Sequence, residues 1–223
     1  TNLYMHSIQI KAWVAYICIL CKYRHMPHER TRHVAEPFQK LCAHSPLIGI
    51  FGHRQVGKTT FLKSHSKTYQ TLDDIAAQES AQANPNVFLT SLGGRMSAID
   101  ECQMAPALFP ALKVWVQNHK KPGQFLLSGS VRFSSRKAIR ESLTGRLSTI
   151  ELFPLVLSEL RDDVLPNTLP RAIEAPTLAG FENTLLLPSS EYLTRRKHYD
   201  KYLDLGGLPG LCFIREQQTR NRM

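Results

Sequence analysis

A glycine-rich loop beginning at Gly52 carries the residue types that bind phosphate. Residues 52–60 read GHRQVGKTT, which has the spacing G-x-x-x-x-G-K-[ST]. An apolar segment, 46–51, precedes the loop, and a helical pattern follows it. Strand, loop and helix together predict a P-loop, in which backbone N–H groups and the helix dipole surround phosphate oxygens. The residues expected to bind the nucleotide are Gly52, Gln55, Val56, Gly57, Lys58, Thr59 and Thr60.

Three side chains are expected to complete the chemistry with the lysine of this loop. Lys58 would reach the β- and γ-phosphates as a point charge, and Thr59 would place its hydroxyl on Mg²⁺. The acidic pair Asp100-Glu101 follows another apolar segment. Asp100 is predicted to hold the Mg²⁺ shell with Thr59, and Glu101 is predicted to polarise the attacking water. The alternative is that these are two surface acids.

Two further residues are candidates for catalysis. Ser128 follows the next predicted strand, where its hydroxyl would touch the γ-phosphate or orient the water; the alternative is a serine that caps a strand end. Arg146 precedes the last strand. It is predicted to reach the nucleotide of a neighbouring subunit as an arginine finger, which implies a homo-oligomer. The alternative is an arginine that interacts with a helix dipole.

The elements that must position these residues alternate between strand and helix from residue 46 onward. This order predicts an α/β fold with a parallel sheet and helices on both faces. The predicted strands are 46–51, 68–72, 95–99, 124–127 and 147–152, the third being weak because Ser97 and Ala98 are small. The predicted helices are 58–66, 75–83, 86–92, 107–119, 136–143 and 190–205, and residues 206–210 are predicted to form a turn.

The N-terminal residues 1–42 contain an apolar run, 12–21, which is shorter than the roughly 20 residues of a membrane span. A helix packed on the core is the favoured interpretation. Cys18, Cys21, His25 and His28 are zinc-ligand types, but their close spacing disfavours a metal site. The five cysteines form no disulfide framework, which favours a reducing cytoplasm.

The chain is basic, with a formal net charge of +10. Half of this excess, +5, lies in residues 43–160, and it suits a polyanionic nucleotide, with nucleic acid as a second candidate partner. A merely soluble basic surface is the alternative. The most basic stretch, expected to contact DNA or a neighbouring subunit, contains Arg132, Arg136, Lys137 and Arg140.

Seven short motifs occur in the order found in a known family. They are residues 52–60, 72–74, 99–103, 106–113, 122–130, 143–146 and 152–155. The chain resembles the prokaryotic AAA-type ATPases, of the AAA+ P-loop class, whose ATPase core precedes a DUF4143 domain. The resemblance implies that Lys58, Thr59, Asp100 and Glu101 keep their family roles, with Ser128 at the sensor position and Arg146 as a candidate finger. His53 departs from the family, which usually has proline there.

These observations divide the chain into three predicted regions. Residues 1–43 are an N-terminal extension of uncertain structure, 44–160 an AAA+ P-loop ATPase core, and 161–223 a linker with the truncated start of a DUF4143-like, helical region. The expected function is ATP binding with Mg²⁺-dependent ATP hydrolysis, with nucleic acid as an expected partner. The alternatives are a non-catalytic nucleotide-binding switch, a truncated remnant, and a small-molecule kinase, against which the acidic pair argues.

Overall fold

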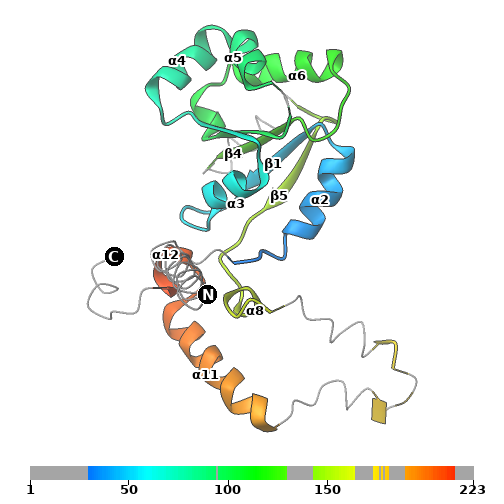
Figure 1. Cartoon of the computed structure of the whole chain (residues 1–223), viewed down its shortest axis with the longest axis vertical. Helices are drawn as coiled ribbons and strands as arrows, with labels where there is room; N and C mark the ends of the chain where they lie inside the picture. The colour runs from blue at the N-terminus through cyan, green and yellow to red at the C-terminus, as the bar shows by residue number, and fades with distance from the viewer. Residues whose placement is uncertain are drawn as a thin grey trace, which may run out of the picture.

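A five-stranded sheet forms the centre of the structure, a computed structural model that describes residues 30–93, 95–129, 143–163, 173–175, 177, 179–180 and 189–213. All strand pairs are parallel, and the strand order is β2-β3-β4-β1-β5. The strands are β1 Leu47–Phe51, β2 Thr68–Thr71, β3 Ser97–Asp100, β4 Phe125–Gly129 and β5 Leu147–Glu151. Helices cover both faces of the sheet (Figure 1), so the predicted α/β class is confirmed.

The helices follow from local sequence signals. Pro85 stands at the first position of its helix, where its missing N–H costs nothing, so the chain breaks between two helices. Asp74 caps the helix before that break, because its Oδ1 accepts from the N–H of Ala77 at 3.0 Å. The helices of the core are α2 Ala35–His44, α3 Lys58–His65, α4 Ile75–Ala83, α5 Pro85–Leu92 and α6 Leu108–Asn118.

Alternate residues of the strands pack into two separate hydrophobic clusters, one on each face of the sheet. Leu47 and Phe51 of β1 face the cluster built with α4, α5 and α6, whereas Ile48 and Ile50 face the cluster built with α2 and α3. Every residue of β1 and β4 is buried, as expected for inner strands covered on both faces. In Figure 1, α4, α5 and α6 lie above the sheet, and α2 and α3 lie below it.

The weak third strand forms in spite of its small residues. Ser97 and Ala98 are fully buried because β3 pairs with β2 on one side and with β4 on the other. The Ser97 hydroxyl donates to the carbonyl of Leu92 at 2.8 Å, which satisfies it without water. Pairing across the sheet therefore compensates for the low apolar content of this segment.

The N-terminal region is integrated with the core from Ala35 onward. Phe38 of α2 is only 1% exposed and packs edge-to-face on Phe61 of α3, with ring centroids 5.2 Å apart. The apolar run 12–21 and the four Cys and His residues within 18–28, whose close spacing disfavours a metal site, lie outside the described residues. The described part of the chain contains no group of three or more His, Cys, Asp or Glu side chains that could hold a metal. None of its helices is long and apolar enough to cross a membrane.

The C-terminal helices dock on the loop that follows β5. They are α8 Leu157–Leu160, α11 Ser189–Leu205 and α12 Pro209–Cys212. The N–H of Leu155 donates to the carbonyl of Gly207 at 2.7 Å, and the Tyr202 hydroxyl donates to the carbonyl of Leu155 at 3.2 Å. A Cβ on Gly207 would lie 2.0 Å from the Leu155 oxygen, so only glycine permits this contact.

Several predicted boundaries shift by one or two residues, and three of these shifts bear on the site. The third strand, predicted at 95–99, is observed at Ser97–Asp100, so Asp100 ends the strand instead of following it. The predicted turn 206–210 is shorter than expected, since a helix begins at Pro209, a residue whose fixed φ suits the first helical position. The fourth strand is longer than expected and continues through Gly129, because β1 pairs with it as far as Phe51. Ser128 therefore lies inside β4 rather than after it. Residues 136–142 of the predicted helix 136–143 lie outside the described residues.

Candidate active site

The glycine-rich loop connects the end of β1 to the start of α3, as predicted. A Cβ on Gly52 would lie 2.2 Å from the carbonyl oxygen of Leu152, so close approach of the backbone requires glycine there. Gln55 and Gly57 have positive φ values of 64° and 99°. The buried side chain of Val56 anchors the loop in the core between them. The first N–H groups of α3 have no partner within the helix and lie at this loop.

The Lys58 side chain lies along the loop instead of extending into solvent. The residue is 7% exposed, and its Nζ donates to the carbonyl oxygens of Gly52 at 3.1 Å and His53 at 2.7 Å. Burial lowers the pKa of Lys58, while the carboxylates of Glu101 and Asp100 act to raise it. The lysine ammonium and the acidic pair therefore share one site, although they are distant in sequence.

Thr59 and Asp100 meet directly. The Thr59 hydroxyl donates to Asp100 Oδ2 at 2.7 Å, and the Tyr69 hydroxyl donates to the same oxygen at 2.9 Å. Asp100 is 3% exposed, and its Oδ1 accepts from the N–H of Glu101 at 3.0 Å. Burial, together with the Asp100 carboxylate, raises the pKa of Tyr69 to about 12.

Two of these groups, the Thr59 hydroxyl and the Asp100 carboxylate, have the oxygen chemistry that magnesium requires. Mg²⁺ is a hard cation that usually binds one or two protein oxygens and keeps several waters. The hydroxyl of Thr59 and the carboxylate of Asp100 supply such oxygens side by side, at the exit of the loop. Their chemistry and position fit the predicted metal set.

Glu101 starts a short 3₁₀ turn, Cys102–Met104, with its own backbone in the left-handed region at φ 53°. Such a conformation costs of order 1–3 kcal/mol for a residue with a side chain, and it is found disproportionately at functional sites. The Glu101 carboxylate accepts a hydrogen bond from Gln103 Nε2. Burial raises the pKa of the thiol of the next residue, Cys102, to about 12, so this thiol stays neutral.

Ser128 lies near the C-terminal end of β4, beside β1 and the start of the P-loop. It pairs with Ile50 in the sheet and is fully buried. Its hydroxyl has no hydrogen-bond partner among the described residues. Buried hydroxyls normally have a hydrogen-bond partner. The Ser128 hydroxyl can therefore still donate or accept a hydrogen bond at the edge of the sheet where the site lies.

Arg146 lies at the opposite edge of the sheet from the P-loop of its own chain. It directly precedes β5, which begins level with the start of β1. Its Nη1 donates to the carbonyl of Thr144 at 3.3 Å, and its own carbonyl accepts from the Ser45 hydroxyl at 3.4 Å. The structure thus does not bring Arg146 to the other site residues, and its role toward a neighbouring subunit stays a prediction. Arg132, Arg136, Lys137 and Arg140 lie outside the described residues.

The sequence interpretation missed one residue that holds the P-loop in place. The side chain of Arg32 is only 11% exposed. Its Nη1 donates to the carbonyl oxygen of Val56 at 2.9 Å, and its Nη2 donates to the carbonyl oxygen of Phe153 at 2.5 Å. Its Nε is 3.2 Å from Oε1 of Glu159, which is buried in α8. No pattern in the segment around Arg32 signals these contacts, because all three partners are remote in sequence.

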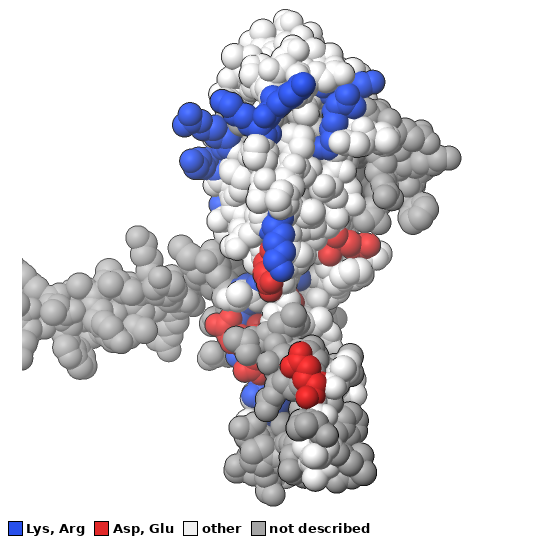
Figure 2. All heavy atoms as spheres, turned by 90° about the vertical axis from the view of Figure 1, so that its right-hand side faces the viewer, with Lys and Arg blue, Asp and Glu red and all other residues white. Residues whose placement is uncertain are grey.

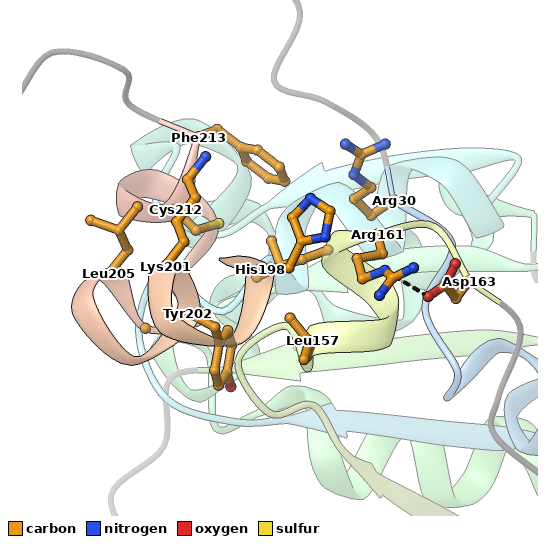
Figure 3. A pocket seen from close by; sticks show the side chains of 12 residues that line it. Arg30, Leu157, Arg161, Asp163, His198, Lys201, Tyr202, Leu205, Cys212 and Phe213 are labelled. Atoms are coloured by element: carbon orange, nitrogen blue, oxygen red, sulfur yellow. Dashed lines mark ion pairs between the residues drawn. The ribbon is translucent and has the colours of Figure 1, made fainter. Parts of the chain in front are cut away.

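Two cavities lie near the contacts that Arg32 makes with the P-loop and α8. One, of about 510 Å³, adjoins the P-loop and is lined by Arg32, Gly57, Thr60, Phe61 and Pro209 among others. The second, of about 490 Å³, lies between α8, α11 and α12. Figure 3 shows the second cavity, with the Arg161–Asp163 ion pair on one side of it and Lys201 and Tyr202 on the other.

Just over half of the chain matches a known protein family. Residues 44–161 match the AAA domain family AAA_14. Two uncharacterized proteins, Mb2031c of Mycobacterium bovis and Rv2008c of Mycobacterium tuberculosis, are each 31% identical to the chain over 134 residues. Each match covers 58% of this chain but only 30% of the relative, so most of each mycobacterial protein has no counterpart in the chain.

A DNA replication initiation factor of known crystal structure is similar at a TM-score of 0.36 and 16% identity, over 78% of this chain and 60% of that one. A likeness at that score supports no conclusion about fold or function, and the DUF4143 resemblance stays a prediction. The AAA_14 match, in contrast, spans more than half of the chain and includes the whole P-loop and the acidic pair. The chain therefore belongs to the AAA_14 family of AAA domains.

Proposed function

We propose that this AAA domain binds ATP and hydrolyses it in a Mg²⁺-dependent reaction. The observation that carries the proposal is the 2.7 Å hydrogen bond between the Thr59 hydroxyl and the Asp100 carboxylate. It joins the last residues of the phosphate-binding motif to the acidic pair, as the chemistry of phosphoryl transfer requires. Magnesium, when bound, neutralises charge on the phosphate oxygens.

The roles of the loop residues follow from their contacts. Lys58 Nζ donates to two loop carbonyls, and phosphate oxygens, which carry more negative charge, are better acceptors for the same ammonium. Thr59 and Asp100 would hold the metal. Glu101 would take a proton from the attacking water, and Ser128 would direct its unpaired hydroxyl toward the γ-phosphate or that water.

The nucleoside half of ATP has a suitable place beside the loop. The cavity of about 510 Å³ lies next to Gly57 and Thr60, and its size falls within the range of ligand pockets. Its walls combine the apolar Phe61 and Pro209 with the hydroxyl of Ser64, which suits a flat base and a polar ribose. We propose that the base binds here.

The test is phosphate release with and without Mg²⁺, measured together with ATP binding by calorimetry. Lys58→Ala is expected to lose ATP binding, since the charge on the β- and γ-phosphates is removed. Glu101→Gln is expected to bind ATP and to release phosphate about 100-fold more slowly, the lower range for loss of a general base. Equal release by wild type and Glu101→Gln would show that the catalytic base has been misassigned.

The second candidate is a nucleotide-binding switch without catalysis. The observation that favours it is the hydrogen bond from Gln103 to the Glu101 carboxylate, which occupies the group proposed as the base. This candidate predicts that wild type binds ATP but releases no phosphate. The same calorimetry and release measurements therefore distinguish the two functions.

A further inference from the structure

The sheet edge where the strands begin carries a row of basic side chains. Because all five strands are parallel, the residues just before each strand lie along this single edge. We call the set Lys67, Arg95, Lys120, Lys121 and Arg146 the basic edge; its members precede β2, β3, β4 and β5. All are exposed except Arg146, which is half-buried. On the face in Figure 2, Lys and Arg side chains gather over the upper part of the molecule with no Asp or Glu among them.

Hydrogen bonds connect the loops of this edge from β2 to β5. The N–H of Lys67 donates to the Met96 carbonyl at 2.9 Å, and the N–H of Met96 donates to the Gly123 carbonyl at 3.0 Å. The N–H of Gly123 in turn donates to the Ser45 carbonyl at 2.8 Å, and the Ser45 hydroxyl donates to the Arg146 carbonyl at 3.4 Å. With neighbouring strands about 4.8 Å apart, the row from β2 to β5 is about 19 Å long.

The positive charge of the basic edge is not compensated locally. Residues 41–46, 66–67, 95–96, 118–124 and 143–146, which form this edge, include no Asp or Glu. Within the described residues, no ion pair involves a member of the basic edge. The acids of the sheet lie at its other edge, after the strands: Asp73, Asp74, Asp100, Glu101 and Glu151.

We propose that the basic edge binds the phosphate backbone of double-stranded DNA. Duplex DNA carries one negative charge per about 1.7 Å of its axis, so an edge of about 19 Å faces about 11 phosphates, enough for every cation to find one. Contacts of these side chains with phosphate oxygens would position the DNA and carry no sequence information. This inference goes beyond ATP hydrolysis, because the edge lies opposite the P-loop.

The test is fluorescence anisotropy of the full chain with a labelled duplex of about 20 base pairs, at several salt concentrations. Four phosphate contacts, one from each of the four exposed members of the basic edge, predict a slope of log K against log salt of about −3.6. Affinity should then fall about 150-fold between about 50 mM and about 200 mM salt.

A double substitution tests whether the edge carries this binding. Lys120→Gln/Lys121→Gln should reduce the slope to about −1.8, so that affinity falls only about 12-fold over the same salt range. The matched control is Arg196→Gln/Lys197→Gln on α11, where both side chains are exposed and the change in charge is the same. We expect the control to keep the wild-type slope.

Three results would overturn the proposal: no retention of DNA by wild type, equal effects of the two double variants, or equal affinity for poly-glutamate or phosphatidylserine vesicles. The last would identify a general polyanion or membrane surface. Lys58→Ala separates this inference from the proposed ATPase, since it should lose ATP binding and keep the wild-type affinity for DNA. The ATPase proposal and the DNA-binding proposal can therefore be refuted independently of each other.

Discussion

Replacement of Ser128 by alanine should make the protein more stable and less active. The Ser128 hydroxyl is fully buried and has no hydrogen-bond partner among the described residues. A buried polar group without a partner costs about 1–3 kcal/mol, and alanine removes that cost while leaving a void of one oxygen atom. We expect a gain of about 1–2 kcal/mol, which for a chain of this size raises the melting temperature by about 2–8 °C.

Ser97 supplies the matched control in the neighbouring strand. It is also fully buried, but its hydroxyl donates to the Leu92 carbonyl at 2.8 Å. Ser97→Ala leaves that carbonyl without its partner, so we expect a loss of about 1 kcal/mol and a lower melting temperature. The two alanine variants should therefore shift the melting temperature in opposite directions, as measured by thermal denaturation of the nucleotide-free protein.

Activity provides the second half of the test. Ser128→Ala should release phosphate more slowly than wild type, because the hydroxyl proposed to contact the γ-phosphate or water is missing, whereas Ser97→Ala should keep the wild-type rate at temperatures where it is folded. If Ser128→Ala is destabilised like Ser97→Ala, its hydroxyl has a structural partner and the reasoning is refuted. If it is stabilised but fully active, the hydroxyl does not serve the reaction.

Two substitutions test how the surrounding elements hold the site. Gly207→Ala places a Cβ 2.0 Å from the carbonyl oxygen of Leu155 in the loop after β5, so α11 and α12 should detach from that loop. Limited proteolysis should then cleave these helices faster than in wild type. Gly210→Ala is the control, because a Cβ there has nothing within 4 Å, and it should behave like wild type. Glu159→Gln leaves Arg32 buried without its charged partner and should cost about 3 kcal/mol in urea denaturation. The exposed Glu36→Gln should change stability by less than about 1 kcal/mol, and an equal effect of both would contradict the buried ion pair.

Local patterns were sufficient to predict the frame of the site. The glycine spacing of the P-loop and the apolar run before it are short-range features, and the structure places a buried strand and a helix on either side, as expected. The helix 75–83 was predicted with the observed bounds, since Asp74 caps its start and Pro85 prevents its continuation. The meeting of Thr59 with Asp100 was predictable because parallel strands end at a common edge.

Other features depend on contacts that no local pattern records. Arg32 holds the P-loop through partners on two different loops and a helix, and each contact exists only because the chain folds back on itself. The length of β4 was underestimated, because pairing with β1 carries the strand through Ser128. That pairing also decides that the Ser128 hydroxyl is buried without a partner.

The phosphate-binding loop, the acidic pair and the α/β alternation follow from the amino-acid sequence alone, because each depends on neighbours within a few residues or on a fixed period. Which distant side chains share a site, and how charge is distributed over the molecule, depends on how the chain folds. The basic edge shows why. Each of its four loops holds one or two cations, and these loops come to lie along one edge, with β1 between the last two, only through the strand order β2-β3-β4-β1-β5. A one-dimensional count of charge contains no information on that order.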